Sequence, residues 1–167
     1  MQTSPGGGPL AARVTASAAE LLAAVARASQ DQWAEALGVA AQAESLRDRV
    51  SPLADITAKA HDDALAAVGG DYELGRAYAK AAEPPLRIAE AAADVAHLAA
   101  HVAQHADAAL RADAVSAGCV AAGCARAAAE LVAVNLTMSA RDERVQRADL
   151  LAEEAARAAD LARAARE

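Results

Sequence analysis

The sequence predicts an all-α fold, an antiparallel bundle of several helices in a single domain. Apolar residues recur at helical spacing along nearly the whole chain, and no alternating strand pattern competes with them. Of the 167 residues 55% are hydrophobic, yet only 2% are aromatic and none is Phe. Because a core of alanine, leucine and valine has small side chains, the helices must pack closely, and the chain would gain from burying more surface in an oligomer.

The first predicted helix covers about residues 9–28 and follows the stretch SPGGGPLAAR, residues 4–13. Pro9 suits the first helical position, after a glycine-rich leader loop, residues 1–8. A tight loop here would deliver backbone N–H groups to a helix N-terminus, which attracts anions. A disordered leader is the alternative, and local chemistry leaves both open.

Three more helices are predicted up to the paired prolines. The second covers residues 31–48, and the third begins after Ser51 as its cap and stops at the glycine pair 69–70. The segment DYELGRAYAKAAE, residues 71–83, is a shorter helix that Pro84 and Pro85 interrupt.

The second half of the chain predicts three long helices. Residues 88–105 are amphipathic, with one apolar face made of Ile88, Ala92, Val95, Leu98 and Val102. After a break at residues 107–111, residues 113–138 are apolar nearly all round, which places that helix at the bundle centre or in a dimer seam. Ser139 precedes a final charged helix that ends at Glu167.

Composition and charge exclude several classes of partner. The net charge is −7 and Lys and Arg form no cluster, which argues against nucleic acid and against anionic membranes. No signal peptide is recognisable. No segment is expected to reach transmembrane quality, since the best candidate, residues 114–134, carries Arg126 and Glu130.

The two cysteines favour a cytoplasmic protein. Cys119 and Cys124 are five residues apart, about 140° around a helix, which suits neither a metal knuckle nor a local disulfide. We therefore expect both to be reduced thiols in the core.

Histidines at positions 97, 101 and 105 lie at i, i+4 and i+8 of one predicted helix. His97 and His105 are roughly 12 Å apart along the axis, so one ion cannot bind all three. We therefore expect a solvated polar face or a second interface, and no metal site. A metal bound by a pair and completed from elsewhere is the alternative.

Asp113 and Asn135 are candidate functional residues at the two ends of the apolar helix. Asp113 is placed to cap N–H groups at its start, or to act in acid–base chemistry at the mouth of a low-dielectric bundle. Asn135 is a lone amide among apolar residues and needs a partner, either a neighbouring helix or a ligand. Gly118 and Gly123 leave space for a close helix or for a flat ligand.

These segments together resemble the cyclodeaminase/cyclohydrolase family, which comprises formiminotetrahydrofolate cyclodeaminase domains and methenyltetrahydrofolate cyclohydrolases. The resemblance covers about residues 5–165 and is carried by PGGG, by PLRIAEAAADVAHLA and by an Asp that opens DAVSAGCVAAGCARAAAELVAVNL. It implies an all-helical homodimer with the glycine loop near a folate-binding cleft. Gly6, Gly7 and Gly8 would then bind the ligand, with Asn135 as a polar anchor and Asp113 as the catalytic group.

The chain departs from the family pattern at several positions. The Ser that usually follows the glycines is Pro9, and a lysine-rich stretch before a Tyr is replaced by residues 30–32 before Trp33. An Asp of the third helix falls at His61, with Asp62 and Asp63 adjacent. A cation for the folate or its glutamate tail is then missing, unless Lys59, Lys80 or Arg87 supplies it.

Two functions follow from the resemblance and its departures. The first is a folate one-carbon enzyme without a cofactor. It would be a hydrolase that opens the methenyl ring with water, or a lyase that closes a ring with loss of ammonia. The second is a non-catalytic helical dimer of the same fold that binds another small molecule or a protein partner.

Overall fold

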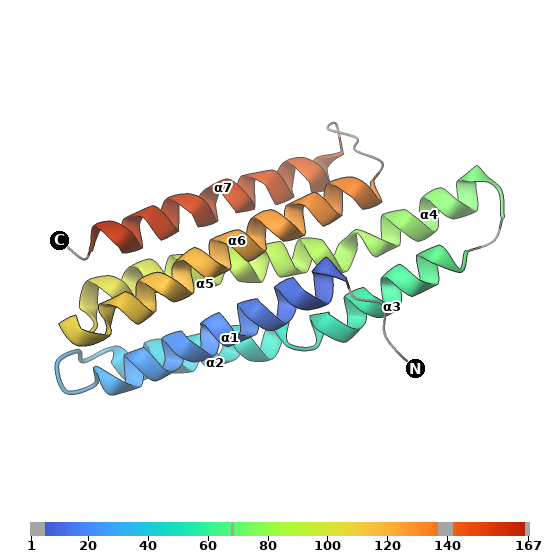
Figure 1. Cartoon of the computed structure of the whole chain (residues 1–167). Helices are drawn as coiled ribbons and strands as arrows, with labels where there is room; N and C mark the ends of the chain where they lie inside the picture. The colour runs from blue at the N-terminus through green and yellow to red at the C-terminus, as the bar shows by residue number, and fades with distance from the viewer. Residues whose placement is uncertain (1–5, 68, 137–141, 166–167) are drawn as a thin grey trace.

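The computed structural model describes residues 6–67, 69–136 and 142–165, which are helical apart from short connections and contain no strand. The helices are α1 (Gly7–Ala28), α2 (Ala36–Val50), α3 (Leu53–Leu65), α4 (Asp71–Ala81), α5 (Glu83–His105), η1 (Ala108–Leu110, a 3-10 turn), α6 (Arg111–Asn135) and α7 (Glu143–Ala164). They run up and down in an elongated bundle, with α3 and α4 extending beyond one end (Figure 1). The predicted all-α bundle is therefore confirmed.

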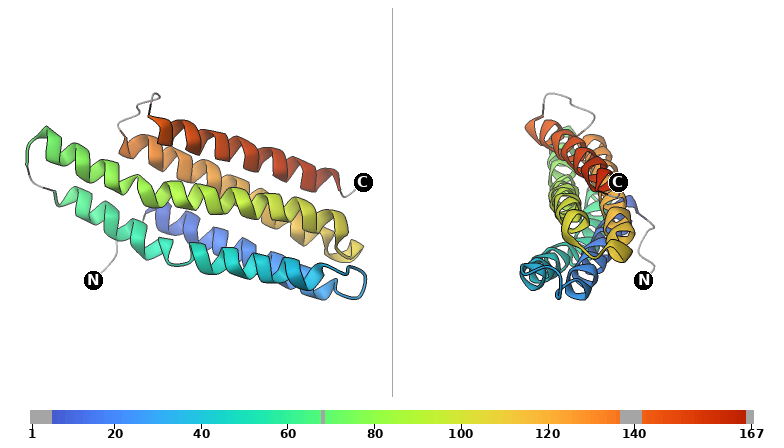
Figure 2. Two further views of the ribbon diagram at one scale, coloured as in Figure 1. Left: turned by 180° about the vertical axis from the view of Figure 1, so that it is seen from behind. Right: turned by 90° about the vertical axis from the view of Figure 1, so that its left-hand side faces the viewer.

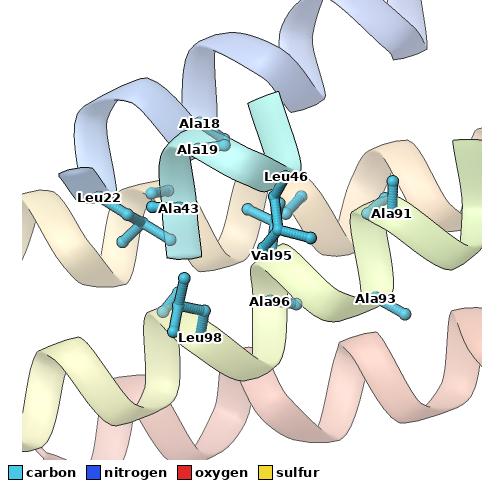
Figure 3. Packing of buried hydrophobic residues seen from close by; sticks show 14 of the residues in the cluster. Ala18, Ala19, Leu22, Ala43, Leu46, Ala91, Ala93, Val95, Ala96 and Leu98 are labelled. Atoms are coloured by element: carbon cyan, nitrogen blue, oxygen red, sulfur yellow. The ribbon is translucent and has the colours of Figure 1, made fainter. Parts of the chain in front are cut away.

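Helix α5 occupies the centre of the bundle. It buries 14 of its 23 residues, including every member of the predicted apolar face, whereas α6 buries 10 of its 25. Its small side chains pack between α1, α2 and α7 (Figure 3). Helix α6 leaves one face exposed and so does not lie at the bundle centre of a single chain, and its alternative place, a dimer seam, stays a prediction.

Close helix approach explains one glycine of α6. A Cβ added at Gly118 would lie 3.0 Å from the Cβ of Ala99 on α5, while a Cβ at Gly123 would meet nothing within 4 Å. Gly118 therefore serves the α5–α6 contact, and Gly123 lies on the open face.

Some helices begin elsewhere than predicted. Helix α1 begins at Gly7, so Gly7 and Gly8 belong to its first turn and Pro9 is its third residue. Helix α2 begins at Ala36, because Trp33 is buried in the preceding turn and its N–H donates to the carbonyl of Ser29. The prolines at 84 and 85 lie in the first turn of α5, where a missing N–H removes no helical hydrogen bond.

Two helical segments, Gly7–Ala28 and Ala108–Asn135, are long and apolar enough to cross a membrane by length and composition. The expectation that no segment reaches this quality is therefore wrong. Both pack inside the bundle, and a core helix passes the same test because it too is apolar on most sides.

Candidate functional site

A pocket opens where the start of α1 meets α3 and the junction of α4 with α5. Its cavity volume is about 90 Å³. Figures 1 and 2 show α1 beginning beside α3 at this end of the bundle, where α6 also ends. The lining residues are Gly6, Gly7, Gly8, Pro9, Thr57, Ala58, His61, Asp62, Ala81, Pro85, Leu131 and Asn135. The structure therefore brings the predicted glycines and Asn135 together.

The pocket contains the N-terminus of α1. Gly6 is the N-cap in extended conformation (φ −138°, ψ 144°), with no side-chain cap and no acidic residue in the first turn. The first N–H groups of a helix have no intrahelical partner, so they favour a carbonyl or an anion at this wall. Pro9 lacks an N–H, which leaves Gly7 and Gly8 as the donors of this turn.

Gly8 also has a packing role that the sequence did not reveal. A Cβ at Gly8 would lie 2.6 Å from Oγ1 and 2.8 Å from Cγ2 of Thr57, a buried residue of α3. A Cβ at Gly7 would stay 3.6 Å from Leu131. Of the expected ligand cradle, Gly8 is thus needed for α1 to approach α3, whereas a Cβ at Gly7 would make only an ordinary van der Waals contact with Leu131.

Asn135 and Arg144 hold the end of α4 that forms one wall of the pocket. Asn135 Nδ2 donates to the carbonyl of Ala81 at 3.3 Å, and Arg144 Nη1 donates to that of Ala79 at 3.0 Å. The amide therefore finds its partner in a neighbouring helix end, while its side chain still lines the pocket.

The titratable side chains of the pocket come from α3. His61 and Asp62 are exposed and line it, whereas Asp63 lies on the other side of α3 and pairs with Lys59. The sequence signal for them was the family position that falls at His61. It did not tell which of the two neighbouring carboxylates faces the pocket.

Asp113 does not reach this pocket within one chain. It is an exposed residue in the first turn of α6, and Asn135 ends the same helix. The 22 intervening steps separate them by roughly 33 Å along the axis. Within one chain Asp113 therefore does not line the pocket of the glycines, and its catalytic role stays a prediction that requires a second chain.

The pocket contains no guanidinium or ammonium group among its described lining residues. Lys59, Lys80 and Arg87 do come together, but they line a different groove between α3, α4 and α5. On α3 the two sets of lining residues alternate, with 57, 58, 61 and 62 on one side and 56, 59, 60 and 63 on the other. The three cations therefore lie on the opposite side of the α3–α4/α5 layer from the pocket.

The histidines pack against the tryptophan at the other end of α1. The Trp33 ring is stacked on His105, with centroids 5.2 Å apart, and meets His101 edge-on at 5.3 Å. His97 lines a surface groove with Arg49 and Asp94. Among the described residues, no three His, Cys, Asp or Glu side chains are grouped to hold a metal ion.

The two thiols differ in exposure. Cys124 is buried, and burial raises the pKa of its thiol, while its hydrogen bond to Thr15 opposes that change. Cys119 is exposed, so the expectation that both belong to the core is wrong for Cys119.

The chain is similar to known proteins in sequence and in fold. A family model described as formiminotransferase-cyclodeaminase matches residues 1–157. The crystal structure of a formiminotetrahydrofolate cyclodeaminase from Thermotoga maritima is similar with a TM-score of 0.88 and 20% identity, covering 98% of this chain and 88% of that one. No curated protein sequence matches the chain significantly.

Proposed function

Because the chain belongs to the formiminotransferase-cyclodeaminase family, we propose that it is a folate one-carbon enzyme whose ligand binds in the pocket at the start of α1. The reaction is either hydrolysis of a methenyltetrahydrofolate or ring closure of a formiminotetrahydrofolate with release of ammonia. No cofactor is needed for either reaction. The observation that carries the proposal is the convergence of a helix N-terminus, a carboxylate and an amide on one partly apolar pocket.

Asp62 supplies the acid–base group in this proposal. In the hydrolytic reaction water adds to the cationic amidinium-like carbon, its proton passes to a carboxylate, and one C–N bond opens to leave a formyl group. An anion beside that carbon stabilises the cation, and general base catalysis activates the water. Asp62 and its neighbour His61 are the titratable groups among the described lining residues, which is why they replace Asp113 here.

The other lining residues bind and orient the ligand. The N–H groups of Gly7 and Gly8 at the α1 terminus donate to a carbonyl of the ligand. The Asn135 amide is held by its bond to Ala81, so its oxygen can accept from a ligand N–H. The apolar walls, Pro85 and Leu131, exclude water from one side of a flat ring.

The decisive test is hydrolysis of methenyltetrahydrofolate, followed by the loss of its near-ultraviolet absorbance. We expect turnover above the spontaneous rate, and Asp62→Asn is expected to lower it by about 10²-fold or more, the scale of general base catalysis. Asp63→Asn is the matched control, because it removes the same charge from the other side of α3. Ammonia release from formiminotetrahydrofolate, measured alongside, distinguishes the two reactions.

Two outcomes would change the proposal. If Asp113→Asn abolishes turnover and Asp62→Asn does not, a second chain completes the site and Asp113 is the acting carboxylate. If no variant and no wild-type preparation exceeds the spontaneous rate at high enzyme concentration, this chain does not perform the chemistry.

A non-catalytic dimer of this fold that binds another ligand or a protein partner is the second candidate. It is favoured by the absence of a cation among the described pocket residues and by Pro9, which removes one donor of the helix terminus. A ligand without a carboxylate tail fits such a pocket better than a folate does.

A homodimer in the cytoplasm is part of both proposals. Its support in the chain is the exposed apolar face of α6, which contains Val120, Gly123 and Val134. Such a face gains free energy when a second copy covers it.

A further inference from the structure

The groove between α3, α4 and α5 is lined by five apolar and five charged residues. Its floor is apolar and its rim is charged. The floor consists of Ile56, Ala60, Ala64, Ala77 and Pro84, and the rim of Lys59, Asp63, Lys80, Glu83 and Arg87. The groove has a cavity volume of about 350 Å³, which is at the lower end of the size range of small-molecule sites (roughly 300–1,000 Å³).

The cations of the rim differ in whether they pair with a carboxylate. Lys59 Nζ lies 2.9 and 3.0 Å from the two oxygens of Asp63, so these two charges offset each other. Glu83 adds to the negative charge around Arg144, whose guanidinium bonds chiefly to Asp142. Neither Lys80 nor Arg87 takes part in an ion pair among the described residues.

Lys80 and Arg87 are held on one nearly continuous helix. Ala82 joins α4 to α5 with helical dihedral angles (φ −77°, ψ −21°), and the N–H groups of Ala82 and Leu86 continue the ladder of hydrogen bonds. Seven residues span roughly 10 Å along the axis, so the two cations lie at either end of the apolar floor. Ile56, 42% exposed, lies in the same groove on α3.

We propose that this groove is a second ligand site, distinct from the pocket at the α1 terminus, and that it binds a small amphiphilic carboxylate with an aromatic or branched-alkyl body. The apolar body covers Ile56 and the alanines, and the carboxylate pairs with Lys80 or Arg87. The inference does not depend on the proposed folate chemistry, because the two sites lie on opposite sides of the α3–α4/α5 layer.

The two isoleucines of the chain can serve as NMR probes of this site. They are Ile56 in the groove and Ile88 fully buried in the core. In a methyl-labelled sample, titration with 2-naphthoate is expected to shift the δ1-methyl resonance of Ile56 to saturation and to leave that of Ile88 in place. The neutral analogue 2-naphthamide is expected to bind at least tenfold more weakly.

Matched charge variants test the role of the cations. Lys80→Gln with Arg87→Gln is expected to weaken 2-naphthoate binding at least tenfold. Arg13→Gln with Arg157→Gln removes the same net charge outside the groove and is expected to leave the affinity unchanged. The Ile88 resonance reports whether each variant is folded, and the comparison of acid with amide on the wild-type protein tests the charge even if the first variant unfolds.

Three results would overturn the proposal. The first is an Ile56 resonance that does not move at millimolar 2-naphthoate, and the second is equal affinity for the acid and the amide. The third is an Ile56 shift that follows protein concentration without added ligand, since a second copy of the chain would then cover the groove.

Discussion

The ionisation of Asp142 is strongly set by its neighbour Arg144. Its Oδ1 accepts from the backbone N–H of Arg144 at 2.9 Å, and the guanidinium of Arg144 bonds to both carboxylate oxygens. The side-chain bonds first, and then the backbone bond, lower the pKa of Asp142 from 3.8 to about 2. Because the folded pKa lies below the unfolded one, the stabilisation is present above pH 3.8 and is lost as the pH falls towards 2.

We therefore expect Asp142→Asn, which keeps a good helix cap but removes the charge, to lower the melting temperature at pH 7. The difference from wild type narrows as the pH falls from about 4 towards 2, and circular dichroism melts at pH 7, 5 and 3 measure it. Asp149→Asn, in the exposed middle of α7, is the control and changes the melting temperature less. A difference in melting temperature that is the same at every pH would mean that the charge of Asp142 does not contribute to stability.

The buried thiol of Cys124 is expected to be unreactive in the folded protein. Burial raises the pKa of Cys124, so little thiolate forms at neutral pH and the side chain is shielded. In a Cys119→Ala background, we expect Cys124 to react with a disulfide reagent only at the rate of unfolding. Rapid reaction under native conditions would contradict its burial.

The sequence predicted some of the site residues but not their roles. The glycines and Asn135 were expected in the site and line one pocket, since a helix start and a helix end meet there. Asp113 was expected to act with them because it matches the acidic residue at the start of this helix in the family that the sequence resembles. Sequence order gives no information on which end of a long helix faces the pocket. Asp62 was missed because adjacent carboxylates differ only in the side of α3 that they face.

At the scale of elements, the crossing of α1 and α3 depends on Gly8. We expect Gly8→Ala to lower the free energy of unfolding by about 1–3 kcal/mol, because its methyl group would overlap Thr57. Gly7→Ala, one residue earlier with 3.6 Å to Leu131, is the matched control. It is expected to be neutral or to stabilise the helix by up to about 1 kcal/mol.

Urea unfolding of both variants measures these differences. Equal stability of the two variants would mean that α3 moves away at little cost. Gly8→Ala would then change the affinity of the pocket for its ligand more than it changes the free energy of unfolding.

Periodicity predicted which segments are helical, but it did not predict where α2 and α5 begin. Helix α2 begins five residues later than expected because a buried ring, Trp33, occupies the turn before it. Helix α5 begins five residues earlier than Ile88, since prolines are compatible with a first turn. In both cases the boundary depends on tertiary packing or on which N–H groups need a partner. The spacing of apolar residues gives no information on either.

At the scale of the whole molecule, the exposed face of α6 predicts self-association. Val134 is 63% exposed and Val120 is 45% exposed on the face of α6 that the rest of the chain leaves uncovered. We expect Val134→Glu to shift a dimer towards the monomer in sedimentation velocity, because a charge would be buried in the interface. Leu161→Glu, on the exposed side of α7 and 57% exposed, is the control. If both variants sediment with the same mass as the wild type, the dimer interface lies elsewhere.

The alanine-rich centre of α5 affects how the bundle fixes its own register. An alanine has no side-chain torsion to freeze, so its burial costs almost no rotamer entropy, but it also fits nearly as well one turn up or down. The larger buried side chains, such as Leu22, Ile88 and Val95, therefore decide how the helices are aligned lengthwise. Trimming one of these few bulky groups would let neighbouring helices slide, whereas exchanging an alanine for serine would change little in their alignment.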